Sequence, residues 1–147
     1  MLHFESEGII FYVINSSDFS RLLSGEERKV MKHVLVVDDM PEIRMVLKAL
    51  LEEPEVEVLE AGNGREALEL LEGVGVDLVV TDCQMPTMTG VELMAEAKTR
   101  YPKLPFIVVS STAREEDLQD LQPLAVMSKP FRMSDLKEAV DQVLAHG

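Results

Sequence analysis

The sequence has few basic residues and a single cysteine, and each scarcity excludes a class of protein. Fourteen lysines and arginines stand against 27 acidic residues, which gives a formal net charge of -13. Proteins that bind nucleic acids usually carry a basic patch or stripe, and none is visible here. We therefore expect no direct binding to nucleic acid and no docking on an anionic membrane. The single cysteine, Cys83, excludes an intrachain disulfide and fits a reducing compartment.

Long hydrophobic runs are also missing. No apolar stretch approaches the roughly 20 residues that a membrane helix requires. Residues 8–14 are apolar but too few to span a bilayer, and Glu5 and Glu7 precede them where a signal peptide would carry lysine or arginine. We therefore expect a cytoplasmic protein. The length of 147 residues predicts one domain, and a hydrophobic content of 46% is enough for a core.

What the sequence does contain, from Met31 onward, is an alternation of apolar runs and amphipathic segments. The runs are continuous and rich in valine and isoleucine, as strands buried on both faces are. They lie near residues 33–38, 56–61, 77–82, 105–110 and 125–128. The alternation predicts an α/β fold with a doubly wound, five-stranded parallel sheet, right-handed crossovers and helices on both faces.

Four capping-box patterns mark where the helices should begin. They are Asp39-x-x-Glu42, Asn63-x-x-Glu66, Thr89-x-x-Glu92 and Thr112-x-x-Glu115. Pro41 suits the first turn of the first helix. The fourth helix should start near Ala113, has few apolar anchors and is limited by Pro123. We therefore expect that helix to be short or irregular.

Residues 1–30 do not join this pattern, and we interpret them as an N-terminal extension of a domain that covers residues 31–147. The extension has three interpretations: an extra strand and helix, a floppy arm, or an artefact of start-site choice. Met31 lies just before the first strand-like run, so it could be the first residue of the domain. The codons for residues 25–29 would be rich in purines, and a ribosome-binding site upstream of a start codon is also purine-rich. We hypothesise that the native protein starts at Met31. An intact mass of the endogenous protein that includes residues 1–30 would disprove this.

Four of the apolar runs end on a polar side chain with useful chemistry. The runs end on Asp38 and Asp39, on Asp82, on Ser110 and on Lys129. Ligands of open α/β sheets bind at the carboxyl ends of the strands. Carboxylates crowded at that edge repel one another and require a cation, whereas a hydroxyl and an ammonium suit an incoming anion. The set predicts a metal-assisted phosphoryl-acceptor site.

Three motifs resemble the receiver domain of bacterial two-component response regulators. They are Val34-Leu-Val-Val-Asp-Asp-x-Pro-x-Ile-Arg44, Asp77-Leu-Val-Val-Thr-Asp-x-x-Met-Pro-x-Met-x-Gly90 and Lys129-Pro-Phe131. The resemblance runs from about Met31 to the C-terminus and suggests a stand-alone, chemotaxis-regulator-like receiver. It implies the flavodoxin-like strand order 2-1-3-4-5. The first and third strands are neighbours in that order, so the three aspartates at their ends should converge.

The resemblance also implies a Mg²⁺ site at these aspartates. Mg²⁺ takes oxygen ligands and keeps several waters. Asp39, Asp82 and the backbone carbonyl of Gln84 would bind it directly, and Asp38 would act mainly through water on the metal.

The implied chemistry is phosphoryl transfer onto Asp82. This carboxylate would attack the phosphohistidine of a sensor histidine kinase or a histidine phosphotransfer protein. Lys129 and the Ser110 hydroxyl would each contact a phosphoryl oxygen. The protein would then be a phosphoacceptor rather than an enzyme, with slow self-dephosphorylation whose rate Gln84 and Thr112 tune.

The sequence indicates less about how phosphorylation would be passed on to a partner. Val126 stands where many receivers have an aromatic residue, so we expect phosphorylation to change mainly residues 111–124. Output would pass through an unknown protein partner or onward in a phosphorelay, from a monomer or weak homodimer. One alternative is a phosphorylation-independent interaction module on the same fold. Another is an aspartyl-phosphate hydrolase, but those enzymes use Asp-x-Asp at a strand end, whereas Asp38 and Asp39 are adjacent.

Overall fold

The computed structural model describes residues 2–6, 9–13, 31–111 and 121–146, and it divides into two units. The first unit is Met1–Val30 and the second is Met31–Gly147. In the first, strands β1 (Leu2–Ser6) and β2 (Ile9–Val13) pair antiparallel. Strand formation therefore occurs within the extension, while the hypothesis of a start at Met31 stays a prediction.

The second unit is built on a parallel sheet of five strands. In chain order they are β3 (Lys32–Val37), β4 (Val56–Ala61), β5 (Leu78–Asp82), β6 (Phe106–Ser110) and β7 (Ala125–Ser128). Their spatial order is β4-β3-β5-β6-β7, and every pairing is parallel. Numbered within the unit this is 2-1-3-4-5, which confirms the predicted fold.

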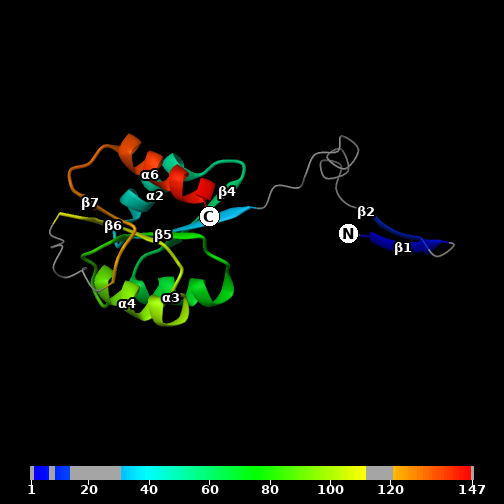
Figure 1. The fold of residues 1–147 in the computed structure, drawn as a ribbon, viewed down its shortest axis with the longest axis horizontal. Coiled ribbons are helices and arrows are strands. Elements are labelled where there is room, and N and C mark those ends of the chain that lie inside the picture. Colours follow the sequence, from blue (N-terminus) through cyan, green and yellow to red (C-terminus); the bar gives the residue numbers. More distant parts are fainter. Residues whose placement is uncertain (1, 7–8, 14–30, 112–120, 147) are drawn as a thin grey trace. The chain divides into compact units, whose positions relative to one another are not determined.

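The helices cover the sheet on both faces, as Figure 1 shows. They are α2 (Pro41–Leu51), α3 (Gly64–Gly73), α4 (Gly90–Arg100) and α6 (Met133–His146). The helices α2 and α6 lie on one side, and α3 and α4 lie on the other. Residues 112–120 lie outside the described part of the chain, so the short fourth helix and most of the segment 111–124 stay predictions. None of the helices in the described part of the chain combines the length and the hydrophobicity that a membrane span requires.

The core consists of two apolar layers, one on each face of the sheet. Successive residues of a strand point to opposite faces, so Val34 and Val36 pack in one layer while Leu35 and Val37 pack in the other. All four are at most 1% exposed. Burying such a side chain stabilises the fold by about 1.5–3 kcal/mol. Packing in the two layers holds the strands in place, and so it also sets the position of the residues at their carboxyl ends.

The helix starts agree with two of the four capping predictions. The Asn63 side chain accepts from the Glu66 amide at 2.9 Å, and Thr89 Oγ1 accepts from the Glu92 amide at 3.2 Å. The pattern at Thr112 lies outside the described residues.

The capping box predicted at Asp39 is wrong. The N-cap of α2 is Met40, and it makes no side-chain capping bond. Pro41 opens the helix without an N–H to satisfy, and the Met40 amide already donates to Asp38 Oδ1 at 2.9 Å. The carboxylate of Asp39 lies instead beside those of Asp38 and Asp82.

Candidate functional site

Three aspartates meet at the carboxyl edge of the sheet. Asp38 and Asp39 follow β3, and Asp82 is the last residue of the neighbouring strand β5. One carboxylate oxygen from each residue lies within 4.8 Å of the others, a spacing that suits a shared metal ion. Asp38 is buried, Asp82 is half-buried and Asp39 is exposed. The structure thus brings together the three residues that the strand ends indicated.

Asp38 is the most constrained of the three. It is 4% exposed, and its Oδ1 accepts a hydrogen bond from the Met40 amide. Burial raises the pKa of the Asp38 carboxyl above its usual 3.8, and the charges of Asp82 and Asp39 act in the same direction. The Met40 amide and the Lys129 ammonium oppose that rise. The metal-free cluster therefore carries a repulsion that a cation would relieve.

The two oxygens of Asp82 have different surroundings. Oδ1 accepts from the Gln84 amide at 3.2 Å, and Oδ2 lies 3.6 Å from Lys129 Nζ. The main-chain carbonyl of Asp82 accepts from Thr81 Oγ1 at 2.9 Å. The contacts with Gln84 and Lys129 orient the carboxylate, and the bond from Thr81 holds the main chain at the end of the strand. The Gln84 carbonyl as a metal ligand stays a prediction, since the described contact involves its amide.

Ser110 and Lys129 lie at the same edge of the sheet and are linked by a main-chain hydrogen bond. Ser110 ends β6 and is 2% exposed. Lys129 directly follows β7, and its amide donates to the Ser110 carbonyl at 2.9 Å. The Lys129 side chain is 36% exposed, so its ammonium is open to an incoming anion. Thr112, the other residue predicted to tune the site, lies outside the described residues.

A cavity of about 260 Å³ opens at this edge of the sheet, and neither Ser110 nor Asp39 is among the residues that line it. Its polar lining includes Asp38, Asp82 and Lys129, and Phe131 contributes to its apolar wall. A larger hollow of about 940 Å³ includes Asp77 and Pro105, which precede β5 and β6, and none of the predicted site residues. The smaller cavity is the functional candidate because it is lined by charged residues of the predicted site, which the larger hollow lacks.

Gly90 supports the end of β5 by close approach. Its amide donates to the Cys83 carbonyl at 2.8 Å, and a Cβ built on Gly90 would lie 2.3 Å from the Asp82 carbonyl oxygen. Only glycine fits there without moving the strand end. Thr87, in the same loop, has a φ of 73°, which is uncommon for a β-branched residue. The loop after Asp82 is therefore held in a defined and unusual path.

Two supporting residues were missed by sequence reasoning, although both stand in the quoted motifs. Arg44 contacts the main chain of Asp38, and Gly90 packs against that of Asp82. A signal existed for Gly90, because glycine is a poor residue for the start of a helix that threonine already caps. An arginine in the first turn of a helix gives no comparable signal.

Comparison with known proteins agrees with this geometry. Residues 34–141 match the response regulator receiver domain family. The transcriptional regulatory protein PdtaR of Mycobacterium tuberculosis is 36% identical over 117 residues, and the match covers 76% of this chain but only 56% of PdtaR. The chemotaxis protein CheY of Pseudomonas aeruginosa is 32% identical over 116 residues, with coverage of 75% of this chain and 94% of CheY.

Solved structures are similar over the same region. The response regulator TrrA of Thermotoga maritima, in complex with Mg²⁺–BeF, has a TM-score of 0.70 and 34% identity, and the match covers 77% of this chain and 99% of TrrA. Vibrio cholerae CheY4 has a TM-score of 0.72 and 27% identity, with coverage of 78% and 99%. Strand order, motifs and relatives therefore agree: the chain belongs to the response regulator receiver domain family of two-component signalling.

Proposed function

We propose that the chain is a phosphoacceptor signalling module that takes a phosphoryl group onto Asp82 with the help of Mg²⁺. The donor is the phosphohistidine of a sensor histidine kinase or a histidine phosphotransfer protein. The observation that carries the proposal is the meeting of three carboxylates within 4.8 Å, with Lys129 Nζ 3.6 Å from Asp82. Output passes to another protein, from a monomer or weak homodimer.

The residues of the cluster fit a hard divalent cation. Three carboxylates supply the oxygen ligands that Mg²⁺ prefers, and Asp38 is held at a raised pKa by burial and by its two acidic neighbours. Asp39, Asp82 and the Gln84 carbonyl would hold the ion directly, and Asp38 would act through an intervening water. When bound, the ion neutralises charge on the transferring group and orients it. The complex of the 34% identical TrrA with Mg²⁺–BeF supports this choice of cation.

The transfer is a displacement at phosphorus. A carboxylate oxygen of Asp82 forms the new O–P bond as the P–N bond of the phosphohistidine breaks, and the imidazole nitrogen keeps that electron pair. Lys129 leaves its contact with Asp82 Oδ2 to pair with a phosphoryl oxygen, and the Ser110 hydroxyl donates to another. These residues act by placement and charge, the main terms in phosphoryl transfer.

The aspartyl phosphate would be removed slowly by water. Gln84 is exposed and lies two residues past Asp82, a position from which its side chain can direct or exclude water. The chain is in this view a phosphoacceptor rather than an enzyme.

Labelling tests the proposal. The chain is incubated with Mg²⁺ and acetyl phosphate, and addition of one phosphoryl group is followed by intact mass. Asp82→Asn should abolish the addition, whereas Asp141→Asn, an exposed aspartate on α6, should leave it unchanged.

Two results would contradict the proposal. Undiminished labelling of Asp82→Asn would mean that the acceptor is another residue. Failure of the folded wild type to label from acetyl phosphate and from a phosphorylated kinase would favour the alternative, a phosphorylation-independent interaction module. The exposed Val126, 37% exposed where an aromatic switch residue is common, is the feature that favours that alternative.

A further inference from the structure

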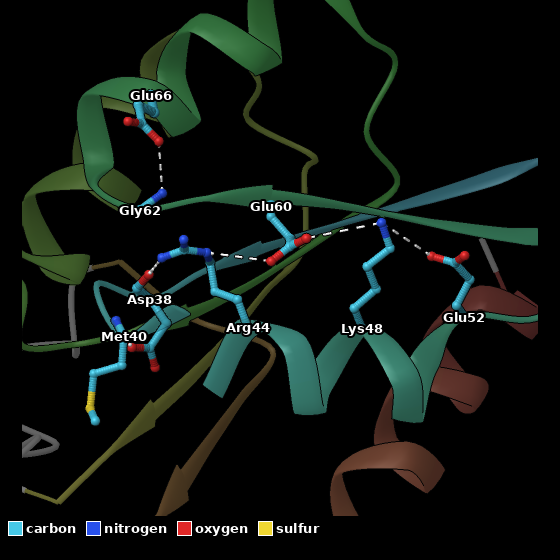
Figure 2. Close-up of polar contacts among 8 residues, drawn as sticks. All are labelled: Asp38, Met40, Arg44, Lys48, Glu52, Glu60, Gly62 and Glu66. Atoms are coloured by element: carbon cyan, nitrogen blue, oxygen red, sulfur yellow. Dashed lines mark hydrogen bonds and ion pairs between the residues drawn. The ribbon is translucent and has the colours of Figure 1, made fainter. Parts of the chain in front are cut away.

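Arg44 lies in the first turns of α2 and reaches back to the strand end that carries the acidic cluster. Its Nη1 donates to the Asp38 main-chain carbonyl at 2.6 Å, and its Nε lies 3.4 Å from Glu60 Oε1 on β4. The Arg44 side chain is 19% exposed. Figure 2 shows the guanidinium between these two partners, with the Asp38 carboxylate turned the other way, toward Met40.

The carbonyl that Arg44 holds belongs to the peptide that joins Asp38 to Asp39. A peptide unit is planar, so fixing its oxygen fixes the rotation of the whole unit and the point from which Asp39 departs. The Asp38 amide donates to the Ala61 carbonyl at 3.1 Å, which secures the preceding peptide. The Arg44 hydrogen bond secures the next peptide in the same way. Because that peptide joins Asp38 to Asp39, Arg44 affects the position of both aspartates without contacting either carboxylate.

The surroundings of Arg44 define its own position. Glu60 also lies 3.9 Å from Lys48, which lies 3.9 Å from Glu52, so the carboxylate that holds Arg44 is itself paired (Figure 2). A Cβ on Gly62 would lie 3.3 Å from Arg44 Nη1, tighter than an ordinary contact. The absent side chain leaves room for the guanidinium, whose planar donors suit two oxygen partners at once.

Two effects of Arg44 on a bound cation oppose each other. As a positive charge at the main chain of the strand end that carries the acidic cluster, it disfavours a second cation. As a hold on the Asp38–Asp39 peptide, it keeps the ligands at the spacing that a cation needs. Glu60 offsets the charge, and the guanidinium contacts the main chain while the Asp38 carboxylate points away (Figure 2). The second effect should therefore dominate.

We propose that Arg44 is a positioning residue for the divalent cation, which acts by holding the Asp38–Asp39 peptide so that the three carboxylates are preset for binding. The inference rests on the proposed Mg²⁺-dependent function of the same site. It adds a residue that touches neither the cation nor the phosphoryl group.

Calorimetric Mg²⁺ titration of the full chain, with and without two substitutions, separates the two effects. Arg44→Met removes both the charge and the hold, and should weaken Mg²⁺ binding by about 10- to 100-fold, as loss of a ligand-orienting partner does. Arg44→Lys keeps the charge but lacks the two-sided donor geometry, and should also weaken binding. An effect of charge alone would instead make Arg44→Met bind more tightly and leave Arg44→Lys unchanged.

Phosphorylation by acetyl phosphate supplies a second measurement. In both variants the Mg²⁺ concentration for half-maximal rate should rise, while the rate at saturating Mg²⁺ should change much less. The matched control is Arg100→Met. Arg100 also pairs with a glutamate, Glu72, but its side chain is 66% exposed and it is the last residue of α4. Its Mg²⁺ affinity should equal that of the wild type.

The Mg²⁺ titrations distinguish failure of this inference from failure of the proposed function. Equal or tighter Mg²⁺ binding by Arg44→Met would overturn the inference alone, because the wild type would still show the proposed function. Absence of Mg²⁺ binding by the wild type would overturn both. If thermal unfolding shows that Arg44→Met does not fold, the charge-conserving Arg44→Lys decides by the same titration, with unchanged affinity as the refuting result.

Discussion

The ammonium of Lys129 lies 3.6 Å from Asp82 Oδ2, so the end of β7 faces the end of β5 across the strand between them. The Asp82 side chain is 13% exposed and that of Lys129 36%. Because the lysine is exposed and the two atoms are not in hydrogen-bond contact, the pair contributes little to stability. Its importance is chemical, because the lysine is already beside the oxygen at which a phosphoryl group would arrive.

Replacing Lys129 should separate cation binding from phosphorylation. We expect Lys129→Ala to fold normally and to bind Mg²⁺ at least as tightly as the wild type, because a competing positive charge is removed. Its rate of phosphorylation should fall on the order of 100-fold, as when one charge-stabilising donor is lost. The control is Lys103→Ala, on an exposed lysine at the larger hollow. Wild-type phosphorylation and signalling by Lys129→Ala would refute the role.

Asp38 should make the metal-free protein less stable as the pH rises. Since its pKa is raised in the folded chain, the folded state keeps this proton to higher pH than the unfolded state does. The contribution to stability is therefore present below the ordinary pKa of 3.8 and is lost as the pH rises through the folded pKa. Urea unfolding in EDTA from pH 4 to 7 should show this decline relative to Asp38→Asn.

The same variant should be more stable than the wild type at neutral pH without metal. Removing one of three crowded charges should raise the free energy of unfolding by about 0.5–2 kcal/mol, while Mg²⁺ should stabilise the variant less than the wild type. Asp135→Asn, on an exposed aspartate in the first turn of α6, should show no comparable gain. A less stable Asp38→Asn would mean that the attraction of the charged carboxylate to the Met40 amide and to Lys129 outweighs the cost of burying its charge.

A methyl group at Gly90 should disturb the acceptor. Gly90→Ala places a Cβ 2.3 Å from the Asp82 carbonyl oxygen and 3.0 Å from Cys83 Cα, both on the main chain. We expect a loss of about 1–3 kcal/mol in unfolding free energy and slower labelling of Asp82. Gly73→Ala is the matched control, because nothing lies within 4 Å of a Cβ there. Equal stability of the two variants would contradict the close approach.

Removing residues 1–30 should leave a folded domain that labels at the wild-type rate. The parallel sheet, its helices and every described site residue belong to the unit Met31–Gly147. Urea unfolding of residues 31–147 should remain cooperative, with a midpoint close to that of the full chain. A broad transition or a large drop in midpoint would show that the extension contributes to the core.

Much of the fold could be predicted because its three central strands, β3, β5 and β6, are buried on both faces. The edge strands β4 and β7 are only partly buried, so the expectation of burial on both faces is wrong for these two. The run expected at residues 33–38 is observed as Lys32–Val37, and the other four match to within one residue. Strand ends then placed Asp38 and Asp82 together, since the carboxyl ends of adjacent parallel strands meet. These features depend on periodicity within short segments, which a sequence displays directly.

What could not be predicted depends on contacts that end on a main-chain carbonyl. The Arg44 side chain donates to the Asp38 carbonyl, and Gly90 packs against the Asp82 carbonyl. Every residue carries such a carbonyl, so the residue types of a motif do not show which carbonyl is contacted. The capping box at Asp39 failed for a related reason: the same short side chain suits a helix cap and a metal site, and local spacing does not decide between them.

The bond from the Lys129 amide to the Ser110 carbonyl makes the length of β7 part of the site. Deleting one residue from β7 would bring Pro130 opposite Ser110, and proline has no N–H to donate. Inserting one would put Ser128 in that place and move the ammonium about 3.3 Å along the strand and onto the other face of the sheet. Single-residue insertions and deletions between Ala125 and Lys129 should therefore be far more damaging than substitutions at the same positions.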